Sequence, residues 1–132
     1  MDNKKLGQLG EDIAVDYLLD KEYKILDRNY TKTWSSRFKG EIDIVAKKDK
    51  IISFIEVKTS QGFCPKRNEG FYPEERVNFK KQSKLVRLAQ AWLEENNMST
   101  ECLWQIDVVS VVVTEGIKEV KISHFKNAVC ES

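Results

Sequence analysis

Apolar side chains in the first twenty residues recur every three or four positions. Between residues 3 and 20 the pattern consists of Leu6, Leu9, Ile13, Ala14, Tyr17 and Leu18. Such a spacing puts the apolar side chains on one stripe of an α-helix, which must be buried against another element. A second stripe of this kind, in a helix predicted over 74–97, consists of Leu85, Leu88, Ala89, Trp92 and Leu93. The chain is therefore expected to contain two amphipathic helices.

The segments between and after these helices are typical of β-strands. They are rich in Ile, Val, Phe and Tyr, and polar or proline-containing stretches separate them. Strands are predicted around 23–26 and at 41–46, 51–58, 103–114 and 118–125. We expect polar loops at 29–39 and 61–73, the second of which contains both prolines.

This order of elements predicts an α/β fold with a central mixed sheet flanked by helices, in the order α-β-β-β-α-β-β. A length of 132 residues suits a single domain over 1–132. No apolar run is long enough to cross a bilayer, and no apolar signal segment follows the N-terminal lysines, so a cytoplasmic protein without membrane contact is expected.

The composition of the chain limits the kinds of functional site that it can form. The 22 Lys and Arg residues balance 21 Asp and Glu residues, so net charge gives no argument for a nucleic-acid partner. The three cysteines are widely spaced, which supports neither a disulfide framework nor a zinc site, and Cys102 is expected to pack. The single histidine, His124, leaves little material for Ser-His or Cys-His catalysis and is expected to be structural.

Alternation across the two hairpin strands predicts where the charged side chains lie. Successive side chains on a strand point to opposite faces, so Phe54, Glu56 and Lys58 should share one face. In the preceding strand, one face should carry Glu41, Asp43 and Val45, and the other Ile42, Ile44 and Ala46. Asp43 should stand opposite Glu56 if the turn has two residues, or opposite Phe54 if it has four. Either register brings Asp43 and Glu56 to one side.

Two carboxylates at this spacing can converge on one cation. Hard oxygen ligands suit Mg²⁺ or Mn²⁺, and such an ion lowers the pKa of bound water enough for phosphodiester hydrolysis near neutral pH. Lys58 could orient that water or stabilise charge on a phosphate. The alternative is a pair of exposed carboxylates with Lys58 as a surface partner; the apolar run at 51–55 argues against it, because it indicates an interior strand.

Read together, Gly40-Glu41-Ile42-Asp43 and Phe54-Ile55-Glu56-Val57-Lys58 resemble the Asp...Glu-x-Lys signature of the restriction-endonuclease-like superfamily. With Leu9-Gly10-Glu11-Asp12, Arg28-Asn29-Tyr30 and Lys81-Gln82 added, the ensemble resembles the YraN-type family of bacterial endonuclease-like proteins, which is similar to archaeal Holliday-junction resolvases. The resemblance implies a restriction-endonuclease-like core, Asp43 and Glu56 as metal ligands, Lys58 as catalytic lysine, Glu11 as an accessory acid and Gln82 as a further site residue.

Basic residues are candidates for DNA contacts that do not read sequence. They are Arg37 and Lys39 in the first loop, and Lys80, Lys81, Lys84 and Arg87 on the second helix, where a solvated helix face is the alternative. By helical projection, Lys81 and Gln82 should point toward the sheet and the other three outward. Ser60 departs from the family pattern, which often has arginine there, and the loops look longer than usual.

Three functions compete. The leading hypothesis is metal-dependent hydrolysis of DNA, on branched or damaged substrates, with a homodimer expected if the substrate is a two-fold junction. The second is a DNA-binding module that keeps the nuclease fold without catalysis, which the balanced net charge and Ser60 favour. The third is a protein-interaction domain that uses loop aromatics at positions 34, 38, 71 and 72.

Overall fold

A computed structural model describes residues 3–61, 79–99, 101–114 and 119–128. Its elements are α1 (Asn3–Asp20), β1 (Lys24–Thr33), β2 (Lys39–Lys48), β3 (Ile51–Gln61), α2 (Phe79–Glu95), β4 (Leu103–Thr114) and β5 (Glu119–Phe125). This confirms the predicted α/β order α-β-β-β-α-β-β. Almost all of the loop predicted at 61–73, and the first residues of the predicted second helix, lie outside the described residues. Neither described helix combines the length and apolar character needed to cross a membrane.

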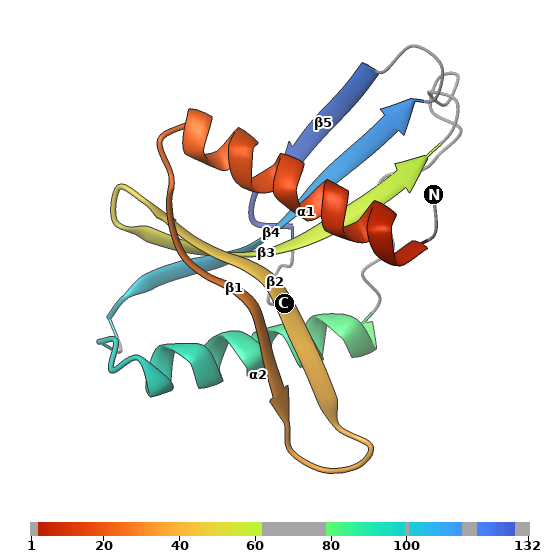
Figure 1. Cartoon of the computed structure of the whole chain (residues 1–132). Helices are drawn as coiled ribbons and strands as arrows, with labels where there is room; N and C mark the ends of the chain where they lie inside the picture. The colour runs from red at the N-terminus through yellow and green to blue at the C-terminus, as the bar shows by residue number, and fades with distance from the viewer. Residues whose placement is uncertain (1–2, 62–78, 100, 115–118, 129–132) are drawn as a thin grey trace.

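The five strands form one mixed sheet in the order β1-β2-β3-β4-β5. Neighbouring strands are antiparallel except β3 and β4, which run parallel. A parallel pair needs a long crossover connection, and the segment that contains α2 supplies it. The two helices lie on opposite sides of the sheet (Figure 1). The strand over 103–114 is interior, as its continuous apolar run predicted.

Each face of the sheet has its own apolar core. The α2-side core contains the predicted stripe of α2 together with side chains of the sheet, among them Ile42, Val45, Ile52, Phe54, Ile106 and Val108. The α1-side core contains Ala14 and Leu18 of α1, Tyr23, and the sheet residues Ile44, Ala46, Ile55, Val109 and Val111. Cys102 is half-buried beside the α2-side core, as expected. The α2 stripe is thus confirmed by what it buries, and the α1 stripe is confirmed from Ile13 to Leu18. Leu6 and Leu9 are half-buried but do not belong to the α1-side core.

The polar loop predicted at 29–39 was wrong. β1 continues to Thr33, β2 begins at Lys39, and the two pair as an antiparallel hairpin that crosses α2 (Figure 1). Tyr30 and Trp34 pack against the α2-side core, and the turn is closed by the Trp34 amide, which donates to the Phe38 carbonyl at 2.8 Å. Contact with α2 therefore stabilises polar strands whose own residues carry a weak strand signal.

The β2–β3 hairpin has the shorter of the two predicted turns. Lys48 pairs with Ile51, and the paired positions extend back to Ile44 and Ile55. Asp49 has a φ of 58°, the left-handed conformation that two-residue hairpin turns favour. One further pair in this register would join Asp43 to Glu56, but the observed pairs end with Ile44 and Ile55.

The alternation predicted for β2 breaks at Asp43. Ile42 packs in the α2-side core together with Val45, whereas Ile44 and Ala46 pack in the α1-side core. The prediction that Ile42 shares a face with Ile44 was therefore wrong. Residues 39–43 of β2 have no paired position on β3 and lie with β1 across α2. The faces of this part of β2 are therefore no longer set by pairing with β3. Asp43 lies between the part of β2 that pairs with β3 and the part that pairs with β1 alone.

Candidate metal centre

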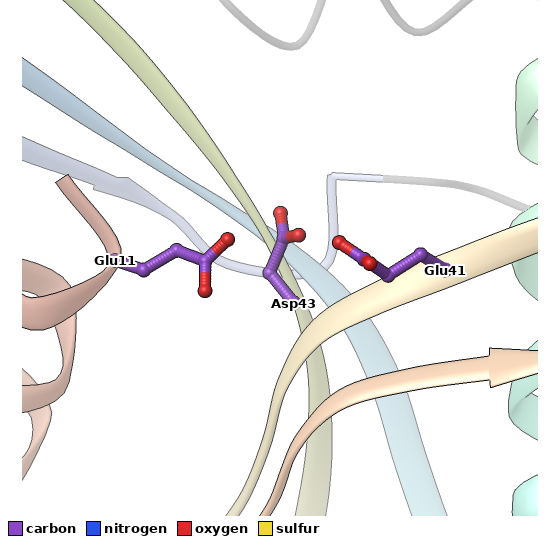
Figure 2. A group of neighbouring side chains, drawn as sticks. All are labelled: Glu11, Glu41 and Asp43. Atoms are coloured by element: carbon purple, nitrogen blue, oxygen red, sulfur yellow. The ribbon is translucent and has the colours of Figure 1, made fainter. Parts of the chain in front are cut away.

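Three carboxylates converge at this break. Oxygens of Glu11 on α1 and of Glu41 and Asp43 on β2 all lie within 4.8 Å of one another. Figure 2 shows Asp43 between the other two, with the three carboxylates directed toward one another. Glu41 is exposed, and Glu11 and Asp43 are partly buried. An all-oxygen set of this kind suits a hard divalent cation such as Mg²⁺ or Mn²⁺.

The surroundings of Asp43 favour its protonated form. Its Oδ2 accepts a hydrogen bond of 2.8 Å from the Val57 amide on β3, which spans the gap where the strands separate. Burial, a hydrogen bond with Glu41 and the charges of Glu11 and Glu56 together raise the pKa of Asp43 to about 8, although the Val57 amide acts in the opposite direction. A cation among these oxygens would remove the repulsion that favours the protonated form.

Glu11 reaches the site because α1 lies unusually close to β3. Gly10 is buried, and a Cβ at this position would fall within 3 Å of three side-chain atoms of Thr59. Glycine therefore permits the close approach and brings the next residue, Glu11, beside β2. The Glu11 side chain is 16% exposed. A helical projection of α1 puts Glu11 at the flank of the buried stripe, in keeping with this position.

Two residues of β1 hold the Glu11 carboxylate. The Asn29 amide group donates to its Oε1 at 2.9 Å, and the Arg28 guanidinium lies 3.8 Å from the same atom while bonding Asp12 at 2.9 Å. The β1–β2 pairs on either side, Arg28 with Ile44 and Tyr30 with Ile42, put Asn29 level with Asp43. Asn29 has a left-handed φ of 52°. A non-glycine residue in this conformation within a strand is strained, which is a frequent feature of functional sites.

Glu56 and Lys58 lie on β3 beside the three carboxylates and pair with each other at 3.6 Å. Their side chains are 13% and 32% exposed, respectively. Phe54 packs toward α2, whereas Ile55 and Val57 pack toward α1, so the predicted alternation of β3 holds. Glu56 is close enough to affect the pKa of Asp43 but is not one of the three converging residues. Its role as a metal ligand stays a prediction.

The remaining predicted site residues lie on α2 and the β1–β2 hairpin. Gln82 is half-buried on α2, and Arg37 and Lys39 are exposed on the hairpin. Lys84 and Arg87 lie over the rings of hairpin residues. The side chains of Lys80 and Lys81 lie outside the described residues.

Sequence reasoning missed Glu41, Asn29 and Arg28 as parts of the site, although all three stand within the motifs that carried the family resemblance. Strict alternation grouped Glu41 with Asp43, yet only the Asp43–Glu56 pair was predicted to bind the ion. The contacts of Arg28 and Asn29 depend on how α1 crosses β1, which no local pattern encodes.

His124 belongs to a separate buried network. Its Nε2 lies 2.8 Å from Asp107 Oδ2 and its Nδ1 lies 3.1 Å from the Tyr17 hydroxyl. Asp107 also accepts hydrogen bonds from Gln105 and from the backbone amide of Asn127. The His124 side chain is 5% exposed. This arrangement joins α1, β4 and β5 and fits the structural role expected for the histidine.

Comparison with known proteins supports the family suggested by the motifs. The model of the uncharacterised protein family UPF0102 matches residues 10–111, which include Glu11, Asp43, Glu56 and Lys58. A UPF0102 protein of Alkaliphilus oremlandii is 41% identical over 130 residues, covering 96% of this chain and 98% of that protein. One from Clostridioides difficile is 40% identical over 130 residues, covering 97% and 99%. One from Tropheryma whipplei is 43% identical over 121 residues, covering 91% and 89%. The chain thus belongs to the UPF0102 family.

Proposed function

We propose that the protein is a metal-dependent endonuclease that hydrolyses phosphodiester bonds in DNA, with branched or damaged DNA as its substrate class. The observation that carries this proposal is the convergence of oxygens from Glu11, Glu41 and Asp43 within 4.8 Å, next to the Glu56–Lys58 pair. A metal ion held there would supply a water molecule of lowered pKa and neutralise charge on the attacked phosphate.

The three carboxylates fit the task of holding such an ion. Asp43 is fixed by the Val57 amide and Glu11 by Asn29, so two of the three ligands are oriented before any ion binds. Glu41 is exposed and can adjust to the ion or to the DNA. This combination of two supported ligands and one solvent-facing ligand leaves the centre open on the side from which a phosphate would approach.

Lys58 and Glu56 would act on the water and the phosphate. Their ion pair keeps the ammonium group of Lys58 on the same side of β3 as Glu56, with a third of its side chain exposed. From there Lys58 can donate a hydrogen bond to a non-bridging phosphate oxygen, and Glu56 can accept one from the attacking water. Charge that develops on the phosphate would then meet a fixed positive group.

The first experiment is a cleavage assay on linear, single-stranded, flapped and four-way-junction DNA with Mg²⁺, Mn²⁺ or a chelator. Wild type is compared with Asp43→Ala and Lys58→Ala, and with Asp16→Ala as a control for loss of an exposed acid from α1. We expect metal-dependent cutting that both site variants reduce at least a hundredfold and the control leaves unchanged. Sedimentation of the protein alone and with the junction measures the expected homodimer.

Cutting that persists in Asp43→Ala would overturn the proposal. Absence of cutting on every substrate, with DNA binding intact and independent of metal, would instead favour a DNA-binding module on the same fold. That second function is supported by the basic side chains where the β1–β2 hairpin meets α2, because they can bind DNA without catalysis.

A further inference from the structure

The balanced net charge conceals a strong separation of charge along the chain. Residues 30–40 and 79–91 contain seven Lys and Arg residues and no Asp or Glu. The other residues therefore have 15 basic against 21 acidic side chains, out of the total of 22 and 21. The two basic segments are far apart in sequence, but the β1–β2 hairpin lies across α2 (Figure 1). The fold thus brings the two basic segments together.

The contact between hairpin and helix is built from aromatic and cationic side chains. The Arg87 guanidinium lies over the rings of Trp34 and Phe38, at 4.7 and 4.4 Å from their centroids. The two rings meet edge to face at 5.1 Å, and the Lys84 ammonium lies 5.9 Å from the Phe38 ring. Gly40 allows this approach, because a Cβ there would lie 2.9 Å from side-chain atoms of both Leu88 and Lys84.

These contacts position the cationic groups without neutralising them. Aromatic rings attract a guanidinium or ammonium group and leave its positive charge and its hydrogen-bond donors available. Arg87, Arg37 and Lys39 are exposed, and Lys84 is half-buried. Lys32 differs, because it forms an ion pair with Glu95, which also accepts a hydrogen bond from Tyr30 at 2.8 Å. We define the clamp surface as Arg37, Lys39, Lys84 and Arg87, supported by Trp34 and Phe38.

We propose that the clamp surface binds the phosphate backbone of double-stranded DNA beside the cleavage site, without reading sequence. The proposal rests on the proposed function for the identity of the polyanion. Cations that are held by aromatic rings, and not by carboxylates, keep their charge available for phosphate groups. The Arg87 guanidinium occupies one face of the Trp34 and Phe38 rings, which leaves less aromatic surface to stack on unpaired bases and favours a duplex over single strands.

The clamp surface has a fixed relation to the carboxylates through β2. Gly40 packs under Lys84, Glu41 follows it directly in the sequence, and Asp43 stands two residues further along the strand. Phe38 lies five positions before Asp43, a span of about 17 Å at the usual rise of a strand. The clamp surface and the carboxylates can therefore contact the same DNA duplex.

The test measures binding alone, by fluorescence anisotropy with a labelled 30-base-pair duplex and a single strand of equal length, in chelator so that no cleavage occurs. The double variant Lys84→Gln/Arg87→Gln is compared with Lys47→Gln/Lys50→Gln, which removes two exposed lysines from the opposite end of β2 and the turn that follows it. Arg87→Lys keeps the charge but not the planar group. Urea unfolding identifies any variant that binds poorly because it is unfolded.

We expect the clamp variant to bind the duplex at least tenfold more weakly at 100 mM salt. The slope of log K against log salt concentration should decrease by about two, one for each phosphate group that the variant no longer neutralises. The control pair should change the slope by less than half as much, and Arg87→Lys should weaken binding with little change of slope. Duplexes of different sequence should bind alike.

Equal losses in the clamp and control variants, or tighter binding to the single strand than to the duplex, would overturn the proposal. These results are separable from the cleavage assay. If the wild type cuts DNA but the clamp variant binds the duplex normally, only the clamp surface is rejected. If the clamp variant binds more weakly, with the expected salt dependence, but the wild type cuts no DNA, only the nuclease activity is rejected.

Discussion

Asp43→Asn should make the metal-free protein more stable while abolishing its response to metal. Asparagine has the size and shape of the protonated acid that folding favours at this position. Its side-chain oxygen can still accept the hydrogen bond from Val57, and its amide group can donate to Glu41. The substitution therefore removes the charge and preserves the local hydrogen bonds.

The magnitude follows from the pKa of Asp43, which rises from 3.8 to about 8 on folding. At pH 7 the folded protein retains this proton, whereas the unfolded chain does not. Each pKa unit corresponds to 1.36 kcal/mol, so the free energy of unfolding is lowered by at most about 4 kcal/mol at pH 7 relative to pH 3.8. Because the pKa is raised, the stabilising contribution is fully present below pH 3.8 and is lost as the pH rises to about 8.

The assay is urea unfolding of wild type and Asp43→Asn between pH 4 and 9 in chelator, with Asp16→Asn as the control for an exposed α1 acid. The stability difference should be near zero at pH 4, grow with pH and level off above pH 8. Added Mn²⁺ should stabilise wild type, by about 2.7 kcal/mol at a hundred times Kd, and leave Asp43→Asn unchanged. Parallel stability curves for wild type and Asp43→Asn over this pH range would refute the reasoning.

Three further variants test the parts that position the site. Gly10→Ala should lower the free energy of unfolding by about 1 to 3 kcal/mol and weaken Mn²⁺ binding, because α1 must move away from β3. Gly7→Ala, with open space around it, should instead stabilise the helix by up to about 1 kcal/mol. Urea unfolding measures the stabilities and calorimetry the Mn²⁺ binding, and equal stabilities of the two variants would contradict the packing argument. Asn29→Gly keeps the left-handed backbone but loses the amide that orients Glu11, so Mn²⁺ affinity should fall about tenfold at nearly unchanged stability; unchanged affinity would exclude a positioning role. His124→Ala should lower the free energy of unfolding by about 3 kcal/mol because it removes a partner of the buried Asp107, and a change below 1 kcal/mol would show that the network is dispensable.

The amino-acid pattern alone determined the number, type and order of the elements. The spacing of apolar residues in helices and strands depends on the local geometry of the backbone. Both helices and the interior strand formed where this spacing predicted them. The hairpin turn at residues 49–50 is equally local, because the polar stretch between two apolar strands limits the register to few choices. The sequence also indicated Glu11, Asp43, Glu56 and Lys58 as the residues from which a site would be made.

Only the tertiary structure decided which of these residues meet. Glu11 joins Glu41 and Asp43 because Gly10 lets α1 approach β3. β2 also leaves β3 at Asp43, so alternation from Val45 no longer predicts the face of Ile42. The polar segment at 29–39 becomes a hairpin because it lies across α2, and the residues that meet there are about fifty positions apart. Local patterns report the conformation that a segment favours by itself; the place where two strands separate, and the element on which a polar hairpin rests, depend on packing among segments distant in the chain.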